Sequence, residues 1–327
     1  MSGKIKVVDL FAGIGGLRIG FESIGAECVF SCELDKFARK TYEANFTPPT
    51  GHVFAGDITE VDAGQVPAHD VLLAGFPCQP FSISGISKRN HMGRLSGFED
   101  RTRGTLFFDI AKILKEKQPQ AFLLENVKNL QHHDKGKTFE TIVRTLTDDL
   151  GYEVYHHIID GQHFVPQRRN RVVIVGFKGA NNFSWGDLRL PPKERQQLSS
   201  ILQPDKEVDG KYVVTDRTLA GMEKHAARHK AAGNGFGYTV VQRNGIARTL
   251  PARYYKNGSD ILIDRGEGNN PRRLTPRECA RLMGFSDEFK IVVSDTQAYK
   301  QFGNSVVVPA IAEVARIMAP HLSTTKR

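Results

Sequence analysis

The sequence predicts an α/β protein built on a doubly wound sheet, with a smaller module rich in strands and loops. Up to residue 177, short apolar runs alternate with segments of helical periodicity, a pattern typical of parallel strands joined by helices. From 178 to 270 the apolar density falls, and glycine and asparagine become frequent, as in AAGNGFGYTVVQRNG. Helical periodicity resumes from 271 to 327. A chain of 327 residues is long enough for one large domain and one smaller domain.

The elements of the large domain are predicted from aliphatic and β-branched runs that are bounded by polar or glycine-containing segments. Gly25 ends the first helix, and GDI at 56–58 follows a short third strand. Other strands are expected at 6–11, 26–33, 71–76, 121–126, 152–159 and 171–177, and helices at 17–25, 36–45, 105–117 and 137–149.

In the 178–270 module, short strand-like segments are expected in place of long helices. After it, RLTPRECARLMGF predicts a helix with Thr275 as N-cap, Pro276 in the first turn and Gly284 as the stop signal. The strand-like segments are YTVV (238–241) and DILID (260–264), and a closing helix is expected from about Asn304 to Met318.

The composition favours a polyanionic partner. Lysine and arginine number 45 against 36 acidic residues, which gives a net charge of +9 and a pI of about 9.3. No apolar run approaches the ~20 residues of a membrane helix, and the N-terminal segment enters a strand almost at once. A cytoplasmic protein without a membrane partner is therefore expected. The basic clusters fall on predicted loops, at 88–94, 101–103, 167–171 and 271–273.

The four cysteines, at 28, 32, 78 and 279, are too few for a disulfide framework in a chain of this length. Cys28 and Cys32 have no second pair to complete a zinc site, so no metal is expected. Cys78 lies in GFPCQPFS, where glycine and proline end an apolar strand. It is either a buried structural thiol or a nucleophile at the sheet edge where α/β proteins bind ligands.

The stretch DLFAGIGG at 9–16 predicts a strand, a glycine-rich turn and a helix, which is the nucleoside site of a Rossmann-like fold. A turn that only packs a helix on a sheet is the alternative, since the match to G-x-G-x-x-G is incomplete. Glu33, twenty residues after Gly13, can hold two ribose hydroxyls, and Asp57 can accept from an adenine amino group. NAD and S-adenosylmethionine both carry adenosine, so these features leave the choice between them open.

Glu125 closes the apolar strand in LLENVKN, at the same sheet edge as Cys78. It either caps the next turn or stays protonated at the end of a buried strand and donates a hydrogen bond. A cysteine and an acid without an evident catalytic histidine argue against a papain-like hydrolase. They suit the activation of a cytosine ring, with thiolate addition at C6, protonation at N3 and methylation of C5 by a methyl sulfonium.

Six motifs in order, DLFAGIGG, GFPCQPFS, LENV, QRRNRV, RECARLMGF and QFGNSVV, resemble the signature motifs of DNA (cytosine-5)-methyltransferases. They span nearly the whole chain outside 178–270. The chain is most similar to the Dcm/EcoRII-type branch, a likeness that extends to the segments 85–100, 234–238, 248–266 and 294–309.

The resemblance implies a Rossmann-like domain that binds S-adenosylmethionine and releases S-adenosylhomocysteine, formed by 1–177 and completed by 271–327. It implies Cys78 as nucleophile, Glu125 as the acid at N3, and Arg169 and Arg171 as residues that orient the flipped cytosine. Leu34 stands where some members carry a tryptophan. The implied cofactor residues are Phe11, Gly13, Gly15, Gly16, Glu33, Leu34, Asp57, Ile58, Pro77, Leu106, Asn304 and Ser305.

The resemblance also implies double-stranded DNA as the partner, with 178–270 as target recognition domain and the loop from Ser82 to Thr105 closing over the duplex. The target would be the inner cytosine of CCWGG (W is A or T), flipped out of the stack. We further expect a monomer; a restriction endonuclease for the same site is a candidate partner whose existence the sequence leaves open. A tRNA cytosine methyltransferase, a non-catalytic DNA-binding protein and an NAD-dependent oxidoreductase are the alternatives. The candidate DNA contacts are Ser84, Lys88, Arg89, Arg94, Arg101, Arg103, Gln167, Asn234, Phe236, Arg243, Thr249, Arg253, Lys256 and Asn257.

Overall fold

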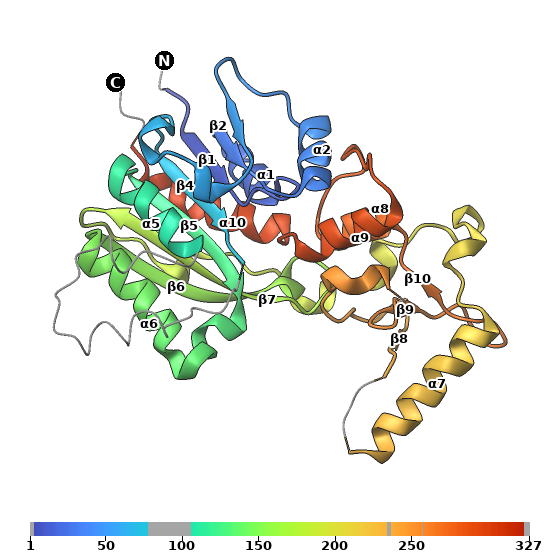
Figure 1. Cartoon of the computed structure of the whole chain (residues 1–327). Coiled ribbons are helices and arrows are strands. Elements are labelled where there is room, and N and C mark those ends of the chain that lie inside the picture. Colours follow the sequence, from blue (N-terminus) through green and yellow to red (C-terminus); the bar gives the residue numbers. More distant parts are fainter. Residues whose placement is uncertain (1–2, 78–105, 234–236, 257, 324–327) are drawn as a thin grey trace.

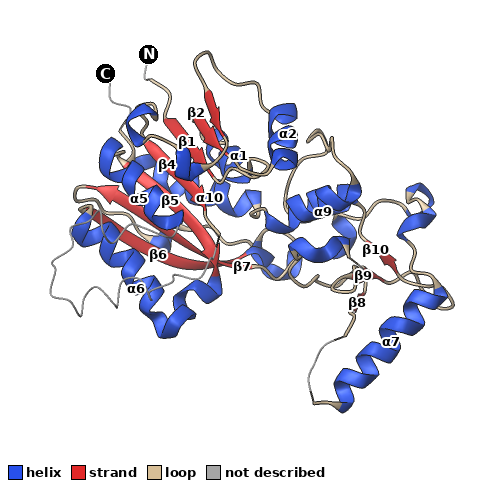
Figure 2. Cartoon of the chain, in the orientation of Figure 1, coloured by secondary structure: helices blue, strands red, loops and turns tan. Residues whose placement is uncertain are grey.

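The structure is a computed structural model that describes residues 3–77, 106–233, 237–256 and 258–323. A seven-stranded sheet forms one part of the molecule and a three-stranded sheet the other (Figures 1 and 2). Cys78 and the predicted loop at 82–105 lie outside the described residues, as do Asn234, Phe236 and Asn257.

The large sheet has the strand order β3-β2-β1-β4-β5-β7-β6, which is a doubly wound arrangement. Successive residues of the central strands point into two separate apolar layers: Leu73 packs in the layer that contains α1 and α10, and Leu72 in the layer that contains α5 and α6. Parallel pairing aligns the carboxyl ends of β1, β4 and β5, with Gly75 paired to Glu125. The strands are Lys6–Leu10 (β1), Glu27–Cys32 (β2), Val53–Ala55 (β3), Val71–Gly75 (β4), Ala121–Val127 (β5), Tyr152–Asp160 (β6) and Asn170–Lys178 (β7), and the helices are Gly16–Glu22 (α1), Lys36–Asn45 (α2), Leu106–Lys117 (α5) and Lys137–Arg144 (α6).

The expectation of an entirely parallel sheet is wrong at β7, which runs antiparallel to both β5 and β6. Only residues 161–169 connect β6 to β7, which is too short for the helical crossover that parallel strands require. As a result, the start of β7 lies beside the end of β5, and Arg171 pairs with Val127. A side chain from the start of β7 thereby reaches the edge where the glycine-rich turn and Glu125 lie.

The 178–270 region contains a 16-residue helix, α7 (Asp216–Ala231), where the sequence predicted no long helix. Thr215 caps its start, and alanine, lysine and arginine favour helix along its length. Met222 is its only buried residue, so the apolar stripe from which a helix is normally predicted is missing. The nearby small sheet has the order β10-β9-β8, with β8 at Val240–Val241, β9 at Leu262–Ile263 and β10 at Arg272–Arg273.

The C-terminal segment returns to the large sheet. Helix α8 (Pro276–Leu282) begins with the predicted Thr275 cap, which forms a reciprocal capping box with Glu278. The single closing helix predicted from Asn304 is wrong at its start, because Asn304 is the last residue of α9 (Asp295–Asn304). Helix α10 (Val308–Met318) begins after a break, with proline in its first turn.

Among the described residues, one helical stretch, Asp295–His321, is long and apolar enough by composition to cross a membrane. It comprises α9, α10 and a final turn, and 61% of its most apolar window is buried inside the protein. Gly20 of α1 lies so close to Ile311 of α10 that a Cβ there would come within 2.4 Å of the Ile311 side chain. This is the packing of a core helix.

Candidate active site

A cavity of about 480 Å³ opens at the carboxyl edge of the large sheet. The glycine-rich turn after β1, the ends of β2, β4 and β5, the start of β7 and the segment that joins α9 to α10 form its wall. Of the residues predicted from the sequence, the wall contains Phe11, Gly13, Gly16, Glu33, Pro77, Glu125, Arg169, Arg171, Asn304 and Ser305.

The turn after β1 has a backbone that most residues disfavour. Phe11 has a φ of 53° and Gly15 a φ of 85°, and a non-glycine residue in this left-handed region is uncommon. A Cβ on Gly15 would lie 2.3 Å from the Phe46 ring, and one on Gly16 would lie 2.7 Å from Val306 Cγ2. The two glycines therefore let the start of α1 approach α2 on one side and the C-terminal segment on the other.

Glu33 follows β2, and the backbone holds its carboxylate from both sides. Oε2 accepts a hydrogen bond from the Gly13 amide at 2.8 Å, and Oε1 accepts one from the Asp35 amide at 2.7 Å. Burial raises the pKa of Glu33, and these amide donors oppose the rise. Each oxygen keeps a lone pair for a further donor, so the fixed carboxylate can bind two neighbouring hydroxyls.

The rim of the cavity joins the N-terminal and C-terminal parts of the chain. Lys300 Nζ lies 2.8 Å from Asp35 Oδ2, and the Thr41 hydroxyl donates to Gln301 Oε1 at 3.0 Å in a buried contact. Asp35, Lys300 and Gln301 line the cavity but were not predicted. Asp35 carried only the signal of a helix N-cap, a role that it also has in the structure.

Glu125 lies at the end of β5 with only 9% of its surface exposed. Its Oε1 forms an ion pair with Arg171 Nε at 2.9 Å. Burial raises the pKa of Glu125 above its ordinary value, although the nearby Arg171 and Arg169 guanidinium groups oppose the rise. The site therefore holds a carboxyl group that takes up a proton more readily than an exposed glutamate.

Arg169 belongs to the cavity wall and is almost completely buried. Its guanidinium donates to the backbone carbonyls of Leu250, Gly303 and Ser305, which belong to two different parts of the chain. Burial lowers its pKa to about 9, so the group remains charged at neutral pH. Arg169 thus fastens the start of β7 to the C-terminal side of the cavity.

Asn126 is a positioning residue that the sequence analysis missed, although it belongs to the LENV motif. Its amide Nδ2 donates to the Phe76 carbonyl at 2.9 Å, and its Oδ1 accepts from the Val127 amide. Phe76 precedes Cys78 by two residues, so β5 fixes the backbone that leads to the cysteine.

Five of the predicted cofactor residues lie outside the cavity wall. Leu34 is 72% exposed, and Asp57 uses Oδ1 to accept from the Thr59 amide at the start of a short helical turn. Gly15 belongs to the glycine-rich turn but faces the Phe46 and Tyr42 rings, Ile58 is buried, and Leu106 begins α5.

The prediction that Gln167 contacts DNA is at odds with the structure. Gln167 is fully buried, its amide nitrogen donates to the Leu282 carbonyl, and its oxygen accepts from the Leu250 amide. Its polar side chain suggested a place on the surface. In the structure, hydrogen bonds to those two backbone groups satisfy the side chain in the interior. The other described candidates, Arg243, Thr249, Arg253 and Lys256, are at least partly exposed.

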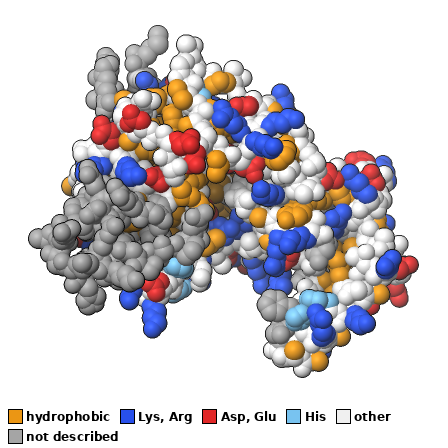
Figure 3. Space-filling view, in the orientation of Figure 1, with side chains coloured by type: hydrophobic (Ala, Val, Ile, Leu, Met, Phe, Trp, Pro, Cys, Tyr) orange, Lys and Arg blue, Asp and Glu red, His pale blue; other side chains and the backbone are white. Residues whose placement is uncertain are grey.

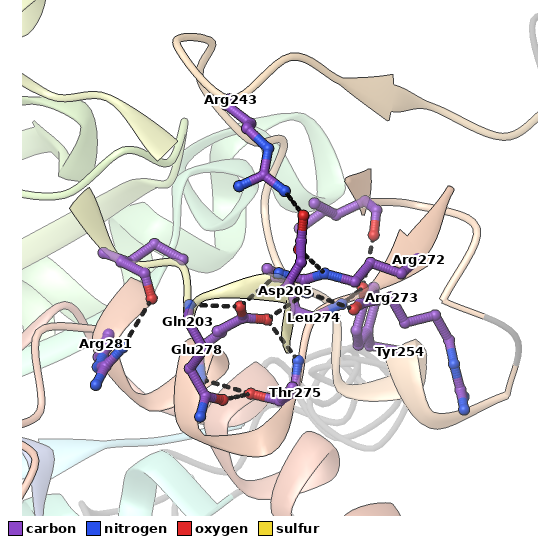
Figure 4. A network of polar contacts seen from close by, with 12 residues as sticks. Gln203, Asp205, Arg243, Tyr254, Arg272, Arg273, Leu274, Thr275, Glu278 and Arg281 are labelled. Carbon is purple, nitrogen blue, oxygen red and sulfur yellow. Dashed lines mark hydrogen bonds and ion pairs between the residues drawn. The ribbon is translucent and has the colours of Figure 1, made fainter. Parts of the chain in front are cut away.

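A network of charged groups holds the small sheet against α8 (Figure 4). Arg272 is buried and its guanidinium lies 2.8 Å from both carboxylate oxygens of Glu278, which is buried as well. Arg272 Nε lies 3.2 Å from Asp205, and Asp205 in turn pairs with Arg243 at the surface. A single chain of contacts therefore connects the core of the C-terminal segment to a predicted DNA-contacting arginine.

The comparisons with known proteins agree with this architecture. The sequence profile of the C-5 cytosine-specific DNA methylases matches residues 5–319. The chain belongs to the C-5 cytosine-specific DNA methylase family. This methylase is 47% identical over 370 aligned residues to a DNA-cytosine methyltransferase of Escherichia coli (strain K12), a match that covers 97% of this chain and 78% of the relative.

The Type II methyltransferase M.SsoII of Shigella sonnei is 50% identical to the methylase over 319 residues, covering 96% of this chain and 80% of the relative. Among solved structures, that of the S. pombe Dnmt2 methyltransferase superposes with a TM-score of 0.72 at 19% identity, covering 97% of this chain and 99% of the other, and shows the fold. The prediction of a DNA cytosine-C5 methyltransferase is confirmed, and membership of the family implies the use of S-adenosylmethionine.

Proposed function

We propose that this methylase transfers a methyl group from S-adenosylmethionine to a flipped-out cytosine, and that its target is the inner cytosine of CCWGG. The target follows from the resemblance to the Dcm/EcoRII-type branch. Support for a DNA substrate, in preference to tRNA, comes from the relatives at 47–50% identity, one of which is named a DNA-cytosine methyltransferase.

The donor set of the cavity fits S-adenosylmethionine, which supplies an electrophilic methyl group on a sulfonium. Glu33 would bind the ribose hydroxyls, because two amides already fix its carboxylate. Asn304 and Ser305 line the cavity on the C-terminal side and would close the methionine end.

In the proposed reaction, the Cys78 thiolate adds to C6 of the cytosine while Glu125 donates a proton to N3. The ring then carries enamine character, and C5 forms the new bond to the methyl group. The bond between that methyl group and the sulfonium sulfur breaks in the same step, so S-adenosylhomocysteine would be the leaving group. Loss of the C5 proton to a base restores the double bond as the thiol leaves, and N3 gives up its proton. Arg171 would hold the Glu125 carboxyl in place, and Arg169 would keep the surrounding wall fixed.

Base flipping is part of the proposal because C5 and C6 are enclosed in the base stack of a duplex. The sequence-based expectation is that the segment 82–105 closes over the DNA and that Ser84 and Phe236 act near the vacated position. We expect the enzyme to work as a monomer in the cytoplasm, with a restriction endonuclease that cuts the same site.

The observation that carries the proposal is the buried Glu125, whose pKa is raised and whose strand pairs with Gly75, three residues before Cys78. The test is a duplex with 5-fluorocytosine at the inner cytosine of CCAGG or CCTGG. Fluorine cannot leave C5 as a cation, so the adduct should persist as a denaturant-resistant complex that requires S-adenosylmethionine. Peptide mapping should place the bond on Cys78.

Two comparisons complete this experiment. Fluorocytosine at the outer position should give no trapped complex, and Cys78→Ala should bind DNA without trapping it. Trapping at a different sequence would keep the chemistry and overturn the target, whereas trapping on tRNA alone would overturn the DNA substrate.

A further inference from the structure

We propose that the C-terminal half of α7 is a phosphate-binding element that contacts the DNA backbone beside the target cytosine. This inference rests on the proposed function and adds to it an interaction surface outside the cavity and outside the loops that were expected to contact DNA.

Helix α7 is attached to the protein along one side only. Leu219 and Met222 pack with Val214, Leu262 and Tyr238 in a small apolar cluster that is separate from the main core. These contacts hold the N-terminal half of the helix against the small sheet. The remaining turns project from it (Figure 1), and most of their side chains, Lys224 and Arg228 included, are exposed.

Basic side chains occupy one side of the projecting turns. Lys224, His225, Arg228 and His229 stand at positions i, i+1, i+4 and i+5, which adjoin each other on a helix. The His225 and His229 rings lie 4.3 Å apart. In the space-filling view, Lys, Arg and His side chains gather over this half of α7, and further Lys and Arg side chains lie between α7 and the large sheet (Figure 3).

The two strong cations of this surface are not neutralised. The basic residues of the module that form ion pairs are Lys193, Lys211, Arg243 and Arg253. Within the described part of the chain, no ion pair involves Lys224 or Arg228. Basic residues near a helix C-terminus also interact with its carbonyls, but that effect is confined to the last turn. It does not extend to Lys224, which lies two turns before the end of α7 and has no ion-pair partner among the residues that the structure describes.

The place of α7 in the chain favours DNA as the occupant. The helix ends at Ala231, three residues before Asn234, in the segment expected to fill the space left by the flipped base. An extended basic side next to that segment complements the phosphates of the same duplex, and such contacts position the protein without reading sequence.

The experiment compares Lys224→Ala/Arg228→Ala with the wild type in binding to a duplex about three helical turns long that carries one CCAGG site. Fluorescence anisotropy at several salt concentrations gives the dependence of log K on log[salt]. Loss of two phosphate contacts should make that slope shallower by about two and weaken binding at low salt. Discrimination against a scrambled duplex should stay as in the wild type, because phosphate contacts carry no sequence information.

The matched control is Lys6→Ala/Lys117→Ala, which removes the same charge from the opposite, amino-terminal edge of the large sheet. Its slope should equal that of the wild type. The proposal fails if the α7 variant keeps the wild-type slope, or if the control loses as much. Lys224→Gln/Arg228→Gln repeats the test in case the alanine pair folds poorly. Should the wild type methylate a sequence other than CCWGG, the comparison on that sequence still decides the role of α7.

Discussion

The two sheets of the molecule hold their polar side chains in different ways. At the edge of the large sheet, Glu125 and Arg171 come from paired strands and are largely shielded from water. Around the small sheet, Arg243 and Arg253 are paired with Asp205 and Asp260 at the surface. Exposed pairs of this kind contribute little free energy and exchange partners easily. The shielded pair at the large sheet suits chemistry that needs groups in fixed positions. The exposed pairs at the small sheet would suit arginines that exchange a carboxylate partner for another anion.

The sharpest test of the fixed groups is Glu125→Gln, which keeps the shape of the side chain and removes its acid. Methyl transfer in single-turnover assays should fall by about 10²–10⁴-fold, the usual contribution of a positioned acid, with little change in DNA affinity. In the wild type, the rate should decline as pH rises through the raised pKa of Glu125, because only its protonated form donates. Glu43→Gln, on the exposed side of α2, is the control. Activity within a few-fold of the wild type would assign the acid role elsewhere.

The buried ion pair between Arg272 and Glu278, which joins the small sheet to α8, should contribute more to the free energy of unfolding than the exposed pairs do. Arg272→Ala leaves Glu278 as an uncompensated charge in the core, and we expect a loss of about 3–5 kcal/mol in the free energy of unfolding. Chemical denaturation monitored by circular dichroism measures it. Arg253→Ala, which removes an exposed arginine, should stay within about 0.5 kcal/mol of the wild type. Equal losses in the two variants would remove the distinction between the regions.

Glu33→Ala should have a smaller effect that is confined to the cofactor. Loss of a charge-assisted hydrogen bond costs about 1.5–3 kcal/mol, which corresponds to roughly a ten- to hundredfold weaker affinity for S-adenosylmethionine in calorimetry. Glu27→Ala, in β2 but outside the cavity wall, serves as the comparison. If a folded Glu33→Ala protein bound S-adenosylmethionine as tightly as the wild type, Glu33 would not belong to the binding site.

The smallest effect is expected for Arg253→Ala in DNA binding. If Arg253 leaves Asp260 for a phosphate, the slope of log K against log[salt] should become shallower by about one. Anisotropy titrations measure this change. An unchanged slope, with lost discrimination against a scrambled duplex, would instead make Arg253 a reader of base edges.

Local sequence patterns were sufficient to predict most of the helices and strands of the large domain. The helix at 36–45 matches α2 in full, and every predicted strand of the large sheet is present within two residues at each end. The glycine-rich motif and the LENV motif also predicted two parts of the cavity wall, the turn after β1 and the end of β5. These signals lie within a few neighbouring residues, where periodicity and turn chemistry act.

What the sequence did not predict depends on contacts between distant segments. The direction of β7 follows from a short connection, and α7 lacks the apolar stripe that reveals other helices. Lys300 and Gln301 line the cavity only because α9 packs against α2. Gln167 was assigned to the surface by its polarity, although its partners lie more than 80 residues away in the chain.

The return of the C-terminal segment also has a consequence for protein synthesis. One wall of the cavity is formed by residues 300–306, which are translated after the small sheet and α7. A nascent chain on the ribosome can assemble β1 to β5 and still lack that wall. It also lacks Arg169 and the three carbonyls that Arg169 later binds, at Leu250, Gly303 and Ser305. The growing polypeptide therefore acquires its complete cavity only after the small sheet and α7 have been made. A message cut short before codon 306 would yield a protein with basic surfaces but without the complete wall of the cavity.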